Sequence, residues 1–488
     1  MPSTSDAAQA TDHRRPRGSS NAERSAYFAR REAAKVLRSV LQGDSRRRAV
    51  GSIKSLVYSP SVRNKKATFA LVCQTLKYLP VIKAVLEDSR VLISKWKRKE
   101  ELVYIVTYDV LFGQAHCPAD DVEKFVLRNK KALQAALHSL LRKKKVKSVD
   151  DLTLVHRISD VTKPRYVRVN TLKIDVESAV LELGKQTMVQ KDSLLPDLLV
   201  LPPATDLHDH PLVLDGSIFL QGKASSMVAA ALNPDPDWLV LDACSAPGNK
   251  TVHLAALMKD RGRIIACELD KKRVDRLKET IRLSGATSVQ ALHGDFLSVN
   301  PNDPPYSEVR AILLDPSCSG SGTSAERLDH LLPSHSPGHA TNGSESGRLN
   351  KLAAFQKKAL AHALSFPSVE KIVYSTCSVH QIENEDVVSS VLPQAASHGF
   401  RLASPLPEWP RRGLPSFAGS ENLIRTDPAE DKEGFFIALF VRERKSKSKR
   451  CSTSTNSLKR LPRSINRQMT LTRVSRLLLL LSRLHQHN

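Results

Sequence analysis

The chain has 488 residues, enough for two or three domains, and carries a formal net charge of +24 with a pI of about 9.8. Its seven cysteines are scattered without a C-x-x-C pair, which argues against a zinc framework or a disulfide scaffold and suits a reducing compartment. Met1–Ser20 is polar and the longest aliphatic run is Leu477–Leu481, so we expect neither a secretory signal nor a membrane span.

The positive charge is concentrated at the two ends of the chain. Lys and Arg outnumber Asp and Glu by 31 to 13 in residues 1–147 and by 11 to none in residues 445–488, whereas residues 148–444 hold 32 basic and 37 acidic residues. Ordinary solvated surface charge gives no reason for such segregation. We therefore expect the ends to bind a polyanion, with nucleic acid as the leading candidate.

The N-terminal part is predicted to be helical after a disordered start. Residues 1–20 are rich in Ser, Arg and Pro. In residues 21–158, apolar residues recur at helical spacing and basic clusters such as Arg142–Lys147 interrupt them. This pattern predicts a basic, helical RNA-binding domain, although a helical cap on a catalytic domain would look similar. Residues 445–488 are predicted to be a basic, disordered tail.

A small α+β subdomain is predicted for residues 159–215, with a face toward RNA. Cationic and apolar residues alternate along Pro164–Thr171, which predicts a strand. An acid-rich helix is expected at Val176–Lys185, followed by short strands near Leu198–Leu201 and Ser217–Leu220. A helix should then begin at Gln221 and run to Leu232.

Residues 216–444 are predicted to be an α/β domain with a doubly wound, mostly parallel sheet of the Rossmann-like type. Short apolar runs alternate with helical segments, as such a sheet requires. The predicted strands are Leu239–Asp242, Arg263–Glu268, Val289–Leu292, Val309–Leu314 and Lys371–Ser375, with a late pair at Phe400–Ala403 and Gly434–Val441.

The loop after the first of these strands, Asp242–Thr251, allows several interpretations. A dinucleotide fingerprint would need G-x-G-x-x-G, and only Gly248 is present. A phosphate loop would need G-x-x-x-x-G-K-[ST], but Ala243 stands at the first glycine and Asn249 separates Gly248 from Lys250. S-adenosylmethionine (SAM) has no phosphates and carries a cation, so it suits a glycine-poor loop beside acids. An ordinary tight strand–helix turn is the plain alternative.

Acids or thiols follow all five predicted strands, at the edge where open α/β sheets bind ligands. Glu268 is placed to accept hydrogen bonds from ribose hydroxyls, and Asp295 to meet an adenine amino group. Asp315 and Cys318 follow the fourth strand, and Cys377 follows the fifth. Because these strands are neighbours in such a sheet, the two thiols can converge on one pocket.

Two thiols, an acid and a methyl donor suit methylation of a pyrimidine at C5. That carbon is a poor nucleophile until a thiolate adds to C6 and converts the ring to an enamine. An acid that hydrogen-bonds N3 and the amino group of cytosine favours this addition. Asp303–Tyr306 spells the signature of enzymes that methylate exocyclic amines, but it precedes the fourth strand instead of following it.

These motifs resemble the Sun-domain RNA (cytosine-5)-methyltransferases over roughly residues 160–442. The resemblance rests on Pro164–Thr171, Gln221–Ser226, Asp242–Thr251, Glu268, Gly294–Asp295, Asp315–Gly320 and Ser375–Cys377. It implies a SAM-dependent methyltransferase in which Cys377 is the nucleophile, Cys318 acts in product release and Asp315 activates the cytosine. It also implies that the cofactor is bound by Asp242, Cys244, Ser245, Ala246, Pro247, Gly248, Asn249, Lys250, Glu268, Asp295 and Asp315, without a metal.

The wording around Cys318 departs from the common family sequence Asp-Ala-Pro-Cys, since here Pro316 follows Asp315 directly. With this version the chain looks most like the branch of the family's fifth mammalian member. That branch implies large-subunit (28S-type) ribosomal RNA as substrate, contact with pre-ribosomal particles, and the nucleolus within the nucleus. A protein of another class, a non-catalytic RNA-binding assembly factor that keeps the SAM fold, is the alternative.

Two segments near the predicted site carry further expectations. Gln381–Val388 is predicted to be one helix, whose acids suit its first turns. Residues 334–347 are rich in Ser, Gly, Pro and His and are predicted to be a mobile loop, either a lid or a tolerated insertion.

If the basic ends hold RNA through phosphates, binding should weaken steeply with salt, by about 0.7 log units per log unit of salt for each single-strand phosphate contacted. Deleting residues 1–147 should raise the RNA dissociation constant and leave SAM binding nearly unchanged. Filter binding over a salt series, with calorimetry of SAM as the control, measures both. An RNA affinity indifferent to salt and to the deletion would contradict this prediction.

Overall fold

The computed structural model describes residues 21–45, 53–91, 94–113, 120–146, 148–149, 151–152, 163–203, 205–323, 328, 331–333 and 342–442. The predictions for residues 1–20 and 445–488 lie outside these residues, as does most of the predicted loop at residues 334–347.

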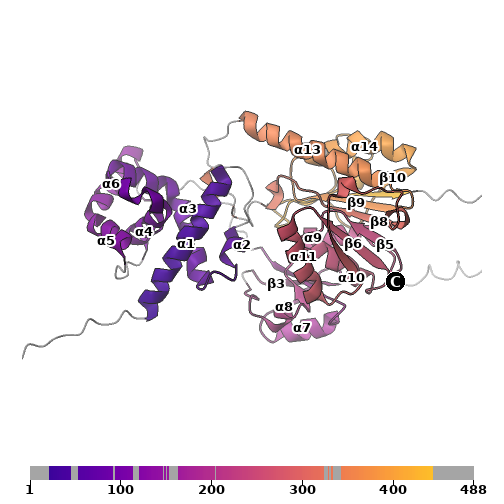
Figure 1. The fold of residues 1–488 in the computed structure, drawn as a ribbon, viewed down its shortest axis with the longest axis horizontal. Helices are drawn as coiled ribbons and strands as arrows, with labels where there is room; N and C mark the ends of the chain where they lie inside the picture. The colour runs from indigo at the N-terminus through magenta and orange to yellow at the C-terminus, as the bar shows by residue number, and fades with distance from the viewer. Residues whose placement is uncertain are drawn as a thin grey trace, which may run out of the picture. The chain divides into compact units, whose positions relative to one another are not determined.

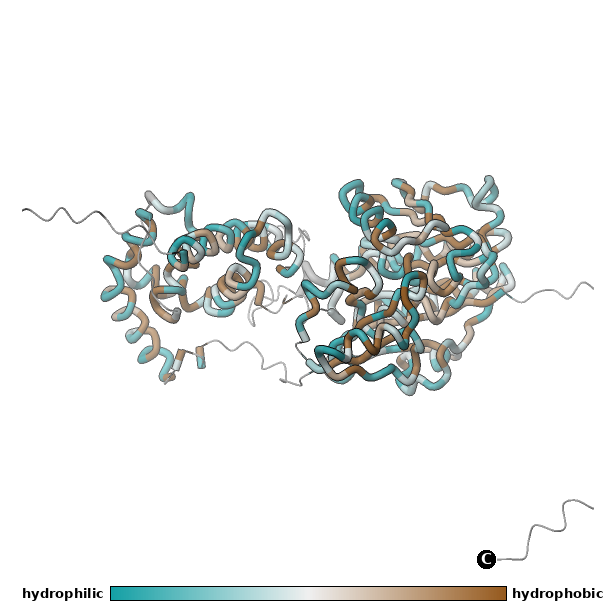
Figure 2. Tube along the Cα trace, turned by 90° about the horizontal axis from the view of Figure 1, so that it is seen from below, coloured by the Kyte–Doolittle hydropathy of each residue, from teal (hydrophilic) through white to brown (hydrophobic). Residues whose placement is uncertain are grey.

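The N-terminal region is built from helices only, within the residues described there. They are α1 (Asn21–Ser45), α2 (Ile53–Val57), α3 (Lys65–Asp88), the 3-10 helix η1 (Ser94–Lys99), α4 (Glu100–Phe112), α5 (Asp121–Arg128) and α6 (Lys130–Lys144). Apolar and polar residues alternate along these helices (Figure 2), and the apolar sides share one core. Arg30 is buried in that core because its guanidinium pairs with Asp109 at 2.9 Å and Glu123 at 3.3 Å.

Helix α3 is both long and apolar. By length and composition alone it could cross a membrane, but a soluble core helix passes the same test. It packs against α1, α4 and α6 and buries Val72, Leu76, Ile82 and Val85 among them. Its hydrophobicity is therefore accounted for by the core of the helical region.

A small antiparallel sheet follows, in the order β2-β3-β1-β4. Its elements are β1 (Arg165–Val169), α7 (Val176–Gly184), β2 (Gln190–Lys191), β3 (Leu198–Leu201), α8 (Pro211–Leu214) and β4 (Ile218–Phe219). The strands expected near 164–171, 198–201 and 217–220 and the helix expected at 176–185 are all present. Because β4 pairs with β1, this sheet continues past residue 215.

The second sheet has eight strands, in the order β10-β12-β9-β8-β5-β6-β7 with β11 paired to β12. Its strands are β5 (Leu239–Asp242), β6 (Arg263–Glu268), β7 (Val289–His293), β8 (Ala311–Leu314), β9 (Lys371–Thr376), β10 (Phe400–Ala403), β11 (Ile424–Arg425) and β12 (Phe436–Arg442). Strands β5 to β9 pair in parallel, and β10 to β12 join antiparallel at the β9 side. The doubly wound, mostly parallel sheet expected from the sequence is confirmed.

Helices cover both faces of this sheet (Figure 1). They are α9 (Lys223–Leu232), α10 (Asn249–Leu257), α11 (Lys271–Ser284), α13 (Asn342–Leu364) and α14 (Glu385–Ser397), with short 3-10 turns η2 (Phe296–Ser298), η3 (Tyr306–Glu308), η4 (Ser321–Thr323), η7 (Gln381–Glu383) and η8 (Ser420–Asn422). Successive strand residues serve opposite faces: Val240 packs with α9 and α10, whereas Leu241 packs with α13 and α14. Both faces of the strands are therefore apolar, which is why they appear as continuous apolar runs.

Three predictions about local structure need correction. Gln381–Val388 is not one helix, because η7 ends at Glu383 and α14 begins at Glu385, with Asn384 at φ −114° and ψ −99° between them. The helix expected from Gln221 begins at Lys223, since Gly222 is extended. The last six residues of the predicted loop at 334–347 lie in α13.

Candidate active site

The functional side chains gather where parallel strands end. Strand β5 ends in Asp242, β6 in Glu268, β8 just before Asp315 and β9 just before Cys377. Because β8 pairs with both β5 and β9, these ends meet at one edge of the sheet. The edge therefore collects the acids and thiols that the sequence predicted there.

The loop between β5 and α10 is packed against its surroundings. Ser245 donates hydrogen bonds to the carbonyl of Cys267 through its amide at 3.0 Å and its hydroxyl at 2.9 Å. Gly248 has φ +111°, and a Cβ there would lie 3.0 Å from the side chain of Thr280. Glycine at position 248 is thus required by the backbone conformation and by close packing.

Asp242 is fully buried behind this loop. Its Oδ2 accepts a hydrogen bond from Thr251 Oγ1 at 2.6 Å, while Oδ1 has no hydrogen-bond partner among the described residues. Burial raises the pKa of Asp242 to about 7, and the charge of Asp315 adds to this effect. A buried carboxylate oxygen left without a donor fits a ligand that brings a cationic or N–H group to this loop.

Glu268 is also buried, and it holds the loop backbone. It accepts hydrogen bonds from the amides of Ala246 at 3.3 Å and Asp270 at 3.0 Å. Arg273 pairs with it at 3.3 Å and also donates to the carbonyl of Ala246 at 2.5 Å. The sequence indicated only a ligand-facing acid at this position, so these bonds to the loop are an addition.

Lys250 and Asp315 form an ion pair at the centre of the edge. Lys250 Nζ lies 2.7 Å from Asp315 Oδ2, and Ser375 Oγ donates to Asp315 Oδ1 at 2.7 Å. Burial disfavours the charge of Lys250, but the attraction of Asp315 outweighs burial and raises the pKa of the ammonium. Lys250 therefore stays charged, and Asp315 keeps a fixed orientation.

The two predicted thiols are in contact. Cys318 Sγ lies 3.3 Å from Cys377 Sγ, much farther than the ~2.05 Å of a disulfide bond. The hydrogen bond with Cys377, together with burial, raises the pKa of Cys318 well above its ordinary value. The Cys318 thiol therefore keeps its proton at neutral pH.

Asp295 and His293 lie apart from this cluster in their contacts. Asp295 is exposed and accepts a hydrogen bond from the amide of Leu297 at 3.0 Å at the start of η2. His293 Nε2 lies 3.0 Å from the carbonyl oxygen of Leu269. Neither side chain contacts the thiols or the Lys250–Asp315 pair in the described hydrogen bonds and ion pairs.

Sequence reasoning missed the burial of Glu383 and Glu385, because it assigned these acids to the first turns of one helix. Both side chains are fully buried, as is that of Asn384 between them. Burial of three consecutive polar residues has no periodic signal in sequence, although their place just after a reactive cysteine was a clue.

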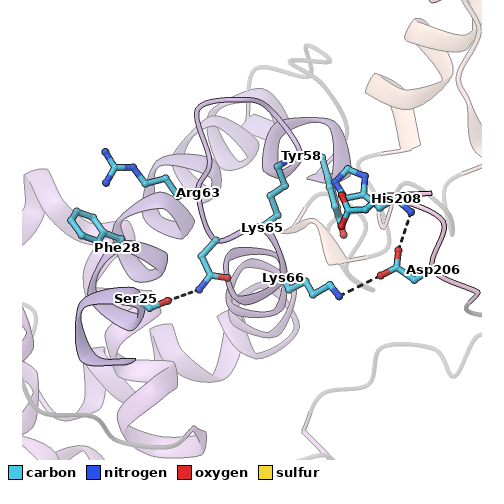
Figure 3. Close-up of a pocket in the computed structure, with 10 residues that line it drawn as sticks. Ser25, Phe28, Tyr58, Arg63, Lys65, Lys66, Asp206 and His208 are labelled. Carbon is cyan, nitrogen blue, oxygen red and sulfur yellow. Dashed lines mark hydrogen bonds and ion pairs between the residues drawn. The ribbon is translucent and has the colours of Figure 1, made fainter. Parts of the chain in front are cut away.

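A groove in the helical region is lined by several basic side chains. It has a volume of about 650 Å³ and is lined by Phe28, Arg31, Lys35, Arg38, Arg63 and Lys99 among others. Arg31 and Arg38 are paired with acids, whereas Lys35 and Arg63 are exposed and have no ion pair among the described residues. The Arg63 guanidinium lies 5.0 Å from the centre of the half-exposed Phe28 ring, and both side chains are drawn in Figure 3.

Three family descriptions match the chain. Residues 229–441 match 16S rRNA methyltransferase RsmB/F. Residues 66–153 match the N-terminal domain of NOL1/NOP2/Sun domain family member 5, and residues 181–221 match the ferredoxin-like domain of the same protein.

Full-length relatives agree with these matches. The 25S rRNA (cytosine-C(5))-methyltransferase NSUN5 of Arabidopsis thaliana is 68% identical over 87% of this chain and 74% of its own length. The 28S rRNA (cytosine-C(5))-methyltransferase of Mus musculus is 40% identical over 80% of this chain and 87% of its own length. Among solved structures, that of PH0851 has a TM-score of 0.59 at 21% identity and covers 84% of this chain and 99% of its own, which shows the shared fold.

The raised pKa of Asp242 makes stability depend on pH. Between about pH 4 and pH 7 the unfolded chain carries this carboxyl ionised while the folded chain keeps it protonated, so its contribution to stability is lost as pH rises through the folded pKa. Asp242→Asn, which cannot titrate, should remove that part of the slope. Urea unfolding at pH 5, 6 and 7 measures it, and equal slopes for both proteins would show that Asp242 is ionised in the fold.

Proposed function

The chain belongs to the family of rRNA (cytosine-C5)-methyltransferases that includes NOL1/NOP2/Sun domain family member 5, and from this we infer that it methylates C5 of a cytosine in large-subunit ribosomal RNA. The observation that carries this proposal is the 3.3 Å contact between Cys318 and Cys377 beside the Lys250–Asp315 pair. A protein that used the fold only as an RNA-binding scaffold would have no need of this arrangement.

SAM is the proposed methyl donor, and when bound it supplies an electrophilic methyl group. The residues present fit it: the Asp242–Lys250 loop is small and closely packed, and Asp242 Oδ1 is buried without a donor. Asp242, Cys244, Ser245, Ala246, Pro247, Gly248, Asn249 and Lys250 are proposed to surround it, with Glu268, Asp295 and Asp315. Acids without a dense glycine cradle suit a cationic ligand that lacks phosphates.

We assign attack to Cys377 and proton transfer to Cys318. Either sulfur can donate across the 3.3 Å contact, and we propose that in the resting pair Cys318 is the donor and Cys377 the thiolate. Cys377 then forms its bond to C6 of the cytosine, while Asp315 hydrogen-bonds the ring and favours the addition. The ion pair with Lys250 holds Asp315 in place for this contact.

The same pair accounts for release. Once the Cys377 sulfur is bonded to C6, Cys318 no longer has the hydrogen bond that is the largest cause of its raised pKa. We propose that Cys318 then passes its proton to solvent and becomes the base for release. The Cys318 thiolate then takes the proton from the methylated C5 as the Cys377–C6 bond breaks. Cys377 leaves as thiolate beside the Cys318 thiol, so the pair is restored and one proton has been released per methyl transferred.

The groove lined by Phe28, Lys35 and Arg63 is proposed to contact RNA. Exposed cations bind phosphates, and a half-exposed aromatic ring beside an arginine can stack on a base. The relatives named for 25S and 28S rRNA support ribosomal RNA as the partner. We propose the pre-ribosomal particle as the context of the reaction and the nucleolus as its location.

The two thiols are separated by single substitutions. Cys377→Ala should abolish methyl transfer and form no covalent RNA adduct, because C6 is not attacked. Cys318→Ala should add the methyl group but retain the RNA, because elimination stalls. A denaturing gel shows the adduct as a slow band that ribonuclease removes and that requires SAM and the target cytosine.

The Cys318→Ala/Cys377→Ala double variant is the control and should lose the band. An adduct in Cys377→Ala but not in Cys318→Ala would reverse the assignment. Full activity in both single variants would exclude covalent catalysis by these thiols.

The groove is tested by Lys35→Ala/Arg63→Ala. The double variant should raise the RNA dissociation constant and reduce the salt slope by about 1.4, the value for two single-strand phosphate contacts. Arg282→Ala, compared with Arg63→Ala alone, is the control of equal charge, because Arg282 is exposed and paired with Glu279 on α11, outside the groove. Equal losses with Arg282→Ala would show that only net charge matters.

A further inference from the structure

A buried carboxylate connects the two loops that carry the thiols. We propose that Glu383 is a positioning residue, which holds the loop bearing Cys318 against the loop bearing Cys377 and thereby sets the alignment needed for release. This inference rests on the proposed function, since it assigns Glu383 a part in the same reaction.

The carboxylate of Glu383 accepts four hydrogen bonds. Oε1 accepts from the Ser319 amide at 2.9 Å and from Gln356 Nε2 at 3.0 Å. Oε2 accepts from Ser319 Oγ and from Ser378 Oγ, each at 2.6 Å. A carboxylate has about four acceptor sites, so the acceptor capacity of this buried side chain is fully used within the protein.

These four bonds converge on the immediate neighbours of the thiols. Ser319 follows Cys318, and Ser378 follows Cys377. Gln356 on α13 also donates to the carbonyl of Ser317 at 3.0 Å, so the residues on both sides of Cys318 are tied to Glu383, one of them through Gln356. The amide of Gly322 also donates directly to the carbonyl of Cys377 at 3.0 Å, so the two loops keep a link without Glu383. Loss of the carboxylate would therefore loosen the Cys318 loop, and it would affect Cys377 less because Cys377 directly follows β9.

The two adjacent buried residues do not make this link. Asn384 accepts from Thr376 Oγ1 at 2.5 Å and donates to the carbonyl of Ser378 at 2.9 Å, both in the segment of Cys377. Glu385 pairs with Arg425 through both carboxylate oxygens at 2.6 Å and accepts from the Leu414 amide at 2.9 Å. Among the described side-chain hydrogen bonds of these three residues, only those of Glu383 reach both thiol loops.

The consequence for the reaction is specific to its second half. Attack needs Cys377 and the cytosine, whereas release also needs the Cys318 sulfur at the C5 proton. Once the Glu383 connection is lost, attack should continue and elimination should slow. The covalent RNA adduct should then accumulate even though both thiols are present.

The test uses the full chain with SAM and RNA that holds the target cytosine. Glu383→Ala should lower methyl turnover about tenfold or more and accumulate the ribonuclease-sensitive adduct seen with Cys318→Ala. Glu383→Gln should restore much of the turnover, because its oxygen keeps the amide donors of Ser319 and Gln356 while the two hydroxyls rotate to accept from its NH₂ group. Ser319→Ala removes one of the links and should accumulate less adduct, which provides a milder variant if Glu383→Ala folds poorly.

Glu385→Gln is the matched control, since it changes an equally buried carboxylate two residues away. It should lower the melting temperature without accumulating adduct. Reduced turnover in Glu383→Ala and in Ser319→Ala without any adduct, or an equal adduct in Glu385→Gln, would overturn the inference. Failure of the proposed function is distinguishable, because then Cys318→Ala itself would give no adduct.

Discussion

The contact between Cys318 and Cys377 depends on the parallel pairing of β8 with β9. Leu314 lies opposite Tyr374 in this pairing, so the two chains leave the sheet at the same level. Cys318 lies four residues after Leu314, and Cys377 lies three residues after Tyr374. Their sulfur atoms are 3.3 Å apart. All four residues of β8 are buried, so apolar packing on both faces holds the register that the chemistry needs.

The charges at this edge depend on one another as well. Asp242 and Asp315 would repel each other in a poorly solvated site. The ammonium of Lys250 reduces this repulsion, because it forms an ion pair with Asp315. Asp242 has no ion pair of this kind: it accepts a hydrogen bond from the Thr251 hydroxyl, and its pKa is raised. This division leaves Asp315 oriented by Lys250 and Ser375, and it leaves Asp242 Oδ1 without a hydrogen-bond partner among the described residues. A cationic cofactor beside the loop would complete the balance of charge.

Much of this architecture can be predicted from the sequence, because buried parallel strands are apolar on both faces and appear as continuous apolar runs. The runs at Leu239–Asp242 and Arg263–Glu268 match β5 and β6 to the residue, and the topology alone brings Asp315 and both cysteines to one edge. What sequence does not reveal is which polar group accepts which donor. Glu383 looked like a helix-start acid, and Glu268 looked like an acid facing only a ligand. Their hydrogen bonds to loops distant in sequence depend on the folded positions of those loops, which no local pattern encodes.

Three consecutive polar residues, Glu383, Asn384 and Glu385, are fully buried at a cost in free energy. Desolvating two carboxylates is unfavourable, and apolar side chains of similar volume would often stabilise a core better. Glu385 offsets its burial with a bidentate ion pair to Arg425. Glu383 faces four neutral donors, drawn from the two thiol loops and α13, so its burial is compensated only while those segments stay together. Any movement that separates the loops would break these hydrogen bonds and leave the desolvation of Glu383 uncompensated. The carboxylate therefore couples the geometry of release to the stability of the fold.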